Sequence, residues 1–283
     1  MTIERNEILL NSSQKPIVYD AYYAPDGQKK PVVVFCHGYK GFKDWGAWNL
    51  VAEAFAEQGF FFLKFNFSHN GGTLLQPIDF PDLEAFAQNN YSKELEDLQQ
   101  ILDFITLSER FQTEVDKEDI NLIGHSRGGG IALIKAEESA DVKRVVTWAG
   151  VSDYRSRFDE GSESFKAWKR TGRKYVENGR TKQQMPHDWQ FYEDFKANED
   201  RLTIKRAASN ISKPYLIIHG DADPTVSLSE AKRLSQWNPK AELKIIEGAD
   251  HVFGAKHPWE GLDIPDDLRK ITEVTIKFLW GHF

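Results

Sequence analysis

The sequence predicts an α/β fold with a mostly parallel, doubly wound sheet, because two patterns alternate along the chain. Apolar runs typical of strands that are covered on both faces occur at residues 31–36, 60–67, 120–123, 142–149, 215–218 and 243–246. Segments with helical periodicity follow them, at residues 48–57, 92–107, 129–138, 229–236 and 267–280. Strands that alternate with helices in this way form parallel sheets through right-handed crossovers.

Two segments depart from this alternation. Residues 3–10 and 17–23 are short apolar or aromatic stretches separated by polar residues, which predicts an antiparallel strand pair at the N-terminal edge of the sheet. Residues 151–213 show no clear strand pattern, so we expect a helical cap inserted into a core of residues 1–150 and 214–283. This insertion is net basic, whereas the whole chain has a net charge of -7.

Basic and aromatic residues recur at helical spacing inside the expected cap. The basic residues are Lys166, Lys169, Arg170, Arg173 and Lys174, and the aromatic residues of the neighbouring face are Phe165, Trp168 and Tyr175. One interpretation is a solvated stripe above an aromatic docking face. The other is a lid whose basic groups attract an anionic substrate, with expected contacts at Trp168, Lys169, Arg170 and Arg173.

The composition excludes several classes of protein. A chain of 283 residues with 40% hydrophobic residues can bury a core, which excludes a wholly disordered chain. Its acidic balance, with a pI near 5.7, gives no support for nucleic-acid binding. The single cysteine, Cys36, rules out an intrachain disulfide and a four-cysteine zinc site. No apolar run could span a membrane and no secretory segment is recognised, so we expect a cytoplasmic protein, whose oligomeric state stays open.

A glycine-flanked serine marks the candidate nucleophile. Ser126 lies in the sequence Gly124-His125-Ser126-Arg127-Gly128, directly after a predicted strand and directly before a predicted helix. Glycines allow a sharp turn there, and the turn can hold the serine in a strained conformation that exposes its hydroxyl. The alternative is a glycine-rich connection with no chemical role.

A serine nucleophile needs a base and a carboxylate that orients the base. Asp223 follows the predicted strand at 215–218, and His251 follows the one at 243–246. Because the carboxyl ends of parallel strands meet at one edge of a sheet, we expect these side chains to lie near Ser126. Asp221 and Asp153 are the other candidate acids, and the other candidate base is His257.

The order serine, acid, histidine resembles that of the α/β hydrolases over almost the whole chain. The loop of residues 220–226 is similar to the family motif G-x-x-D-x-x-V, which favours Asp223 as the acid. His37-Gly38-Tyr39 resembles the H-G-x motif of the family. The resemblance therefore implies an oxyanion hole made by the backbone amides of Tyr39 and Arg127.

Residues 37–45 extend this resemblance to small bacterial serine esterases of the cinnamoyl-esterase and dienelactone-hydrolase kind, and to prolyl-oligopeptidase-like proteins. It implies a serine hydrolase that cleaves a carboxylic ester of a small acyl or aryl substrate through an acyl-enzyme, with no metal or cofactor. The alternatives are a prolyl-oligopeptidase-like peptidase, a thioesterase, an acyltransferase and, least favoured, a silent ligand-binding protein.

Four further features have open or structural interpretations. His37 is expected to hold its loop by hydrogen bonding rather than bind a metal, and Cys36 is expected to be buried and inert. His69, in a glycine-rich loop, is a candidate for substrate contact or for plain loop hydrogen bonding. Residues 40–48 could wall the acyl pocket, although packing on the sheet is the favoured interpretation.

Overall fold

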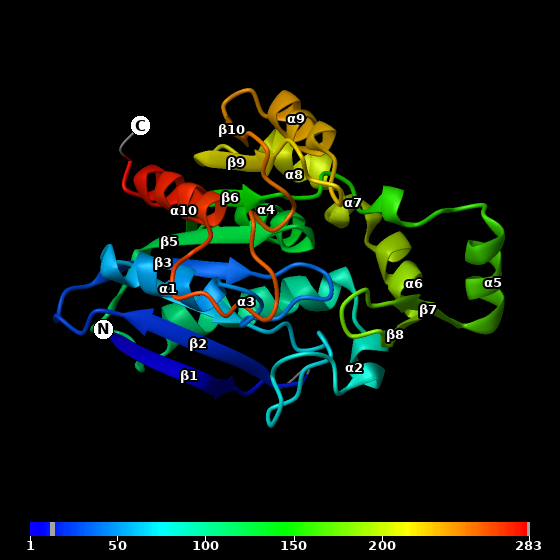
Figure 1. Cartoon of the computed structure of the whole chain (residues 1–283), viewed down its shortest axis with the longest axis horizontal. Coiled ribbons are helices and arrows are strands. Elements are labelled where there is room, and N and C mark those ends of the chain that lie inside the picture. Colours follow the sequence, from blue (N-terminus) through cyan, green and yellow to red (C-terminus); the bar gives the residue numbers. More distant parts are fainter. Residues whose placement is uncertain (12–14, 282–283) are drawn as a thin grey trace.

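An eight-stranded sheet organises the computed structural model, which describes residues 1–11 and 15–281 (Figure 1). The strand order is β1-β2-β4-β3-β5-β6-β9-β10. Strand β2 pairs antiparallel with β1 and β4, and the remaining neighbours pair parallel. The structure therefore confirms a mostly parallel sheet with an antiparallel N-terminal edge.

The strands of this sheet are β1 (Thr2–Leu9), β2 (Ile17–Tyr23), β3 (Lys30–Cys36), β4 (Phe61–Phe65), β5 (Val115–His125), β6 (Val142–Trp148), β9 (Tyr215–Gly220) and β10 (Glu242–Ile246). The helices outside the segment 151–213 are α1 (Trp48–Glu57), α2 (Leu83–Ala87), α3 (Tyr91–Leu107), α4 (Arg127–Glu138), α9 (Leu228–Trp237) and α10 (Asp266–Leu279).

Both faces of the sheet are covered by helices, which explains the unbroken apolar runs in the sequence. Val32 and Val34 of β3 belong to a core that contains the apolar faces of α3 and α4. Val33 and Phe35 of the same strand belong to the opposite core, with α1 and α10. Because alternate residues of a strand point to opposite faces, the central positions of β3, residues 32–35, must all be apolar for both cores to form.

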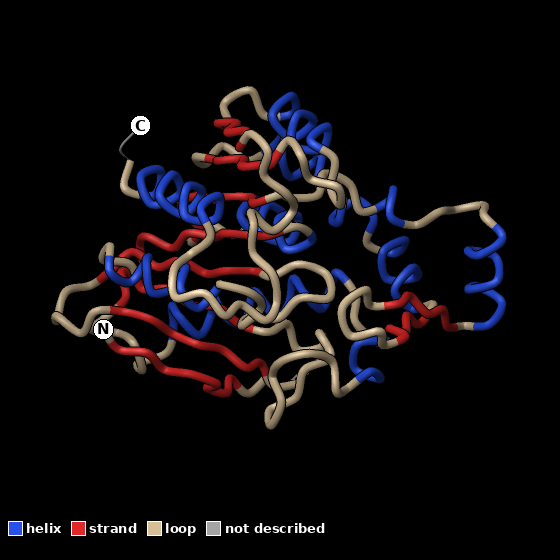
Figure 2. The backbone as a smooth tube through the Cα atoms, viewed as in Figure 1, coloured by secondary structure: helices blue, strands red, loops and turns tan. Residues whose placement is uncertain are grey.

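The segment 151–213 contains a strand pair that we did not predict. After the short helix η1 (Arg155–Arg157) come α5 (Glu163–Thr171), β7 (Arg173–Glu177), β8 (Gln184–Asp188), α6 (Gln190–Ala197), α7 (Glu199–Leu202) and α8 (Ile204–Asn210). Strands β7 and β8 form an antiparallel hairpin (Figure 2). The segment therefore contains helices, as expected, and in addition a strand pair that was not identified from the sequence. Figure 1 shows the hairpin, α5 and α6 beyond the carboxyl ends of β3 and β5.

The predicted basic stripe is divided by the end of α5. Gly172 adopts a left-handed conformation with φ 78°, a backbone geometry that ends helices and favours glycine. Lys169 and Arg170 consequently stay on the exposed surface of α5, while Arg173 and Lys174 belong to β7. The five basic residues do not form one helical face.

A buried network of charges anchors the loop between β3 and α1. The carboxylate of Asp20, in β2, forms ion pairs with the ammonium nitrogens of Lys43 at 2.6 Å and Lys64 at 2.5 Å. The Asp20 side chain is 1% exposed. The same two lysines contact Asp44. Since Lys43 and Asp44 belong to the loop that begins with His37, these ion pairs fix the loop against the antiparallel edge of the sheet.

No helix in residues 1–11 and 15–281 combines the length and the apolarity needed to cross a membrane.

We predict that Asp20→Asn lowers the free energy of unfolding by about 3–5 kcal/mol, because two buried ammonium groups then share one carboxylate. Urea denaturation measures this difference. Asp119→Asn is the matched control, since Asp119 pairs with Arg144 where both side chains are 26% exposed. Its expected cost is about 0–1 kcal/mol. Equal losses in the two variants would contradict the role given to the buried network.

Candidate active site

Ser126 occupies a strained turn between β5 and α4. Its backbone has φ 56° and ψ -119°, a conformation that residues other than glycine rarely adopt. The flanking glycines are required by close approach, because a Cβ atom on Gly124 would lie 2.2 Å from the carbonyl oxygen of Gly128. A Cβ on Gly128 would lie 2.4 Å from the carbonyl oxygen of Cys36. The turn that holds the serine is therefore closely packed against the end of β3.

The three side chains that follow β5, β9 and β10 form one hydrogen-bonded chain. The Nε2 atom of His251 lies 3.0 Å from the Ser126 hydroxyl oxygen, and its Nδ1 atom lies 2.7 Å from Oδ2 of Asp223. A carboxylate can only accept, so Nδ1 carries the proton and Nε2 is free to accept from the serine hydroxyl. This arrangement can remove the proton of Ser126 and make it a nucleophile.

Asp223 is held in its ionised form. Burial raises its pKa, but hydrogen bonds from His219, His251 and the backbone amide of Val226 outweigh burial and hold the pKa of this carboxyl well below its usual range. The amides of Thr225 and Val226 donate to its Oδ1 at 2.7 and 2.9 Å. The carboxylate is therefore fixed in position and charge beside the imidazole.

The other candidate acids and base accept hydrogen bonds from backbone amides elsewhere. Asp221 accepts from the amide of Gly248 at 2.7 Å, and Asp153 accepts from that of Arg155 at 2.8 Å. His257 accepts from the amide of Gly46 at 3.0 Å. None of these contacts involves Ser126.

Two backbone segments adjoin the serine. Arg127 is the first residue of α4, so its amide has no carbonyl partner within the helix and lies at the positive end of the helix dipole. The loop with Tyr39 passes on the other side, since a Cβ on Gly38 would lie 2.9 Å from the Cβ of Ser126. These segments could supply amides to an oxygen that becomes negative during acyl transfer.

His37 and Cys36 have structural contacts. His37 accepts from the amide of Phe67 through Nε2 at 3.3 Å and contacts the carbonyl oxygen of Gly38 through Nδ1 at 2.9 Å. Burial lowers the pKa of His37 to about 4, so the ring is neutral. Cys36 is buried, and burial raises the pKa of its thiol. Among the described residues, no group of three His, Cys, Asp or Glu side chains could hold a metal ion.

His125 is a positioning residue that sequence reasoning missed. Its Nε2 atom lies 2.9 Å from the carbonyl oxygen of His251, and burial lowers its pKa to about 3. A neutral His125 thus donates to the backbone of the loop that carries the imidazole. The motif around Ser126 gives no signal for this role, because any residue type can precede the serine in it.

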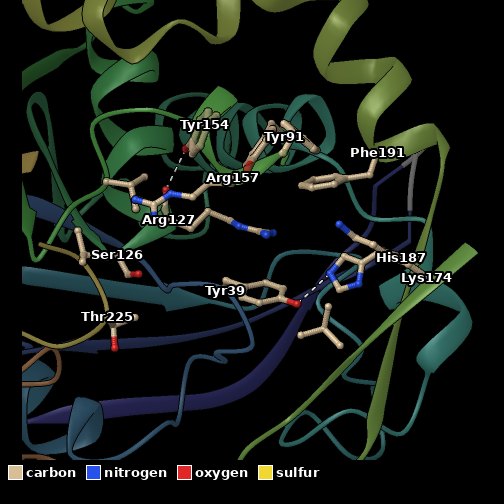
Figure 3. Close-up of a pocket in the computed structure, with 14 residues that line it drawn as sticks. Tyr39, Tyr91, Ser126, Arg127, Tyr154, Arg157, Lys174, His187, Phe191 and Thr225 are labelled. Carbon is tan, nitrogen blue, oxygen red and sulfur yellow. Dashed lines mark hydrogen bonds between the residues drawn. The ribbon is translucent and has the colours of Figure 1, made fainter. Parts of the chain in front are cut away.

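A cavity of about 270 Å³ opens beside Ser126. Its lining residues are Tyr39, Tyr91, Ser126, Arg127, Val151, Tyr154, Arg157, Phe158, Lys174, Val176, His187, Phe191, Thr225 and Val226 (Figure 3). They come from the loops after β3, β6 and β9, from the turn at Ser126, and from α3, α4, η1, the hairpin and α6. Such walls are brought together by tertiary packing, and no local sequence pattern marks them.

The predicted substrate contacts do not line this cavity. Trp168 is buried beneath the hairpin, where its indole donates to the carbonyl oxygen of His187 at 2.8 Å. Arg173 pairs with Glu84 and Asp188. Lys169 and Arg170 lie on the exposed surface of α5.

His69 is also outside the cavity lining and is a buried loop residue. Its Nδ1 atom lies 2.8 Å from the hydroxyl oxygen of Ser68, and burial lowers the pKa of the ring to about 4. This contact is hydrogen bonding within the loop itself.

A second cavity, of about 160 Å³, lies on the His251 side of the serine. Trp45 and Trp48 line it together with Tyr39 and His125. Trp48 is also buried against Phe35, with ring centroids 5.0 Å apart, so the loop between β3 and α1 both packs on the sheet and walls this cavity.

Comparisons with known proteins agree with this architecture. The chain is 27% identical over 147 residues to the uncharacterized peptidase YtmA of Bacillus subtilis, a match that covers 50% of this chain and 51% of YtmA, about half of that relative. It is 26% identical over 294 residues to the non-heme chloroperoxidase CPO-A1 of Kitasatospora aureofaciens, covering 92% of this chain and 96% of that one. The esterase domain of a Rhodothermus marinus protein superposes with a TM-score of 0.65 at 21% identity, over 98% of both chains.

The likeness to that solved structure shows the fold alone. Residues 33–262, well over half of the chain, match the model of the alpha/beta hydrolase family. On this match, and on the topology that agrees with it, the protein belongs to the α/β-hydrolase family.

Proposed function

We propose that the protein is a serine esterase, which cleaves a carboxylic ester of a small acyl or aryl substrate through an acyl-enzyme intermediate. The observation that carries the proposal is the hydrogen-bonded chain from Ser126 through His251 to Asp223, at 3.0 and 2.7 Å. The strained backbone of Ser126 supports it, since such strain is typical of functional turns.

In this mechanism His251 takes the proton of Ser126 as the hydroxyl oxygen attacks the ester carbonyl carbon. Asp223 stabilises the imidazolium, and the amides of Tyr39 and Arg127 donate to the oxyanion. His251 then protonates the leaving alcohol as the acyl-enzyme forms. The same histidine next takes a proton from a water molecule as its oxygen attacks the acyl carbon. The bond between this carbon and the Ser126 oxygen then breaks, His251 returns the proton to Ser126, and the acid is released.

The two cavities would hold different parts of the ester. The alcohol must leave from the side on which His251 can protonate it, and His251 lines the cavity of about 160 Å³. The cavity of about 270 Å³, which His251 does not line, would then hold the acyl group. Its aromatic walls fit an apolar or aryl acyl chain.

In the same proposal, residues 151–213 act as a cap over the acyl group, inserted into a core of residues 1–150 and 214–283. The support is their share of the cavity lining, which is Val151, Tyr154, Arg157, Phe158, Lys174, Val176, His187 and Phe191. Such a cap excludes water from the acyl cavity and sets the size of the acyl group.

The second candidate function is peptide cleavage, because YtmA is named a peptidase. A panel of nitrophenyl esters of increasing acyl length, aryl acyl esters and a dipeptidyl anilide separates the two. We expect turnover of esters and little of the anilide. Faster turnover of the anilide would favour the peptidase.

We predict that Ser126→Ala abolishes ester hydrolysis, with a fall in kcat of about 10⁴- to 10⁶-fold because no acyl-enzyme can form. A fluorophosphonate should modify the unaltered protein at Ser126 and leave the variant unmodified, as read by mass spectrometry. A silent binding protein would take up no label. Label on a different residue would also refute the assigned nucleophile.

We predict that Asp223→Asn lowers kcat by about 10⁴-fold, since the amide favours the wrong tautomer of His251. Asp221→Asn is the matched control, because Asp221 lies in the same loop and loses the same charge while its side chain still accepts from Gly248. Steady-state kinetics should show this control within a few-fold of the unaltered protein. A comparable loss in both variants would leave Asp223 without its special role.

A further inference from the structure

The cavity proposed to hold the acyl group carries charge of one sign. Arg127, Arg157 and Lys174 line it, and no acidic side chain is among the described residues that do so. His187 adds no charge, because burial lowers its pKa to about 3. An apolar cavity with several cations and no acid favours a ligand with a negative group.

The three cations differ in how far other residues neutralise them. Arg157 pairs with Glu230, which also accepts from the amide of Ser152 at 2.7 Å. No carboxylate in residues 1–11 and 15–281 lies within ion-pair distance of Lys174. Its ammonium group instead lies over the ring of Trp168, 3.8 Å from the centroid. Lys174 is therefore the cation with charge left for a ligand.

Arg127 has only part of its hydrogen-bonding capacity in use. Its guanidinium lies 3.2 Å from Oε1 of Glu94 through one nitrogen. It stacks over the ring of Tyr39 at 4.4 Å and approaches Phe191 at 5.4 Å. A guanidinium has five N–H donors, and Glu94 accepts from one nitrogen of Arg127, so other donors are available to a ligand in the cavity. Figure 3 shows this side chain between Ser126 and Lys174.

Loss of water at Lys174 has a cost that a ligand could offset. Burial lowers the pKa of Lys174, because its ammonium loses solvent without gaining a carboxylate. The hairpin holds the residue against Trp168 in spite of that cost. A carboxylate bound between Lys174 and Arg127 would offset the lost hydration of the Lys174 ammonium through charge-assisted hydrogen bonds.

We propose that the acyl group of the substrate ends in a carboxylate, which Lys174 and Arg127 bind at the end of the cavity remote from Ser126. An apolar or aryl segment between ester and carboxylate would contact the aromatic walls. This inference rests on the proposed esterase function. Of the five basic residues in the expected stripe, it uses Lys174 alone, because the other four do not line the cavity.

The test compares two esters of equal length, the mono-nitrophenyl ester of suberic acid and the same ester with its free carboxylate converted to a primary amide. The ratio of kcat/KM for the acid over the amide measures recognition of the charge. We expect a ratio above one in the unaltered protein, which falls as salt screens the interaction.

Lys174→Met should lower this ratio by at least about tenfold, the effect of one charge-assisted hydrogen bond. Lys169→Met is the matched control, because it removes the same charge from the exposed surface of α5, and its ratio should not change. An unchanged ratio in Lys174→Met, or equal falls in both variants, would overturn the proposal. A ratio of one or less in the unaltered protein would also overturn it, even if Lys174→Met did not fold.

Failure of the underlying function looks different. If the protein is no esterase, neither ester is turned over and no fluorophosphonate adduct forms at Ser126. If only the carboxylate site is wrong, both esters are hydrolysed and the adduct forms, but the acid has no advantage over the amide.

Discussion

The turn that holds Ser126 is the constraint on which the rest of the site depends. Its positive φ costs on the order of 1–3 kcal/mol and persists only where the surroundings determine it. Those surroundings are β5 and α4, which meet at Gly124 and Gly128 without room for a Cβ atom. Because the turn touches the end of β3, the serine, the loop with Tyr39 and the free amides of α4 cannot move independently.

The core and the hydrogen-bonded chain were predictable because each part has a local signal. A buried strand is an apolar run, and Ser126, Asp223 and His251 each lie in the turn or loop after such a run. Parallel strands align their carboxyl ends, so sequence order was enough to bring the three side chains to one edge. His125 was missed because its contact is with a backbone carbonyl 126 residues away, which no residue pattern encodes.

The segment 151–213 was only partly predictable, for a physical reason. Lys174 and Tyr175 continue the spacing of α5 in sequence, but the left-handed backbone of Gly172 ends the helix before them. A single glycine leaves the periodicity intact and changes the direction of the chain. The walls of the larger cavity have the same origin, since Tyr91 and Phe191 contact each other from helices 100 residues apart, with ring centroids at 4.9 Å.

In the proposed function, Arg127 takes part in both the chemistry and the recognition of the acyl group. Its amide is free at the start of α4, while its guanidinium extends into the larger cavity and pairs with Glu94. A substitution of Arg127 other than proline would keep the backbone amide and would remove the guanidinium together with its contact to Glu94. Lys174 differs from Arg127, because it lies in β7 of the hairpin and not in the turn at Ser126. Under the proposed function, substitutions in the hairpin would therefore change the preferred acyl group while the strained turn stays the same.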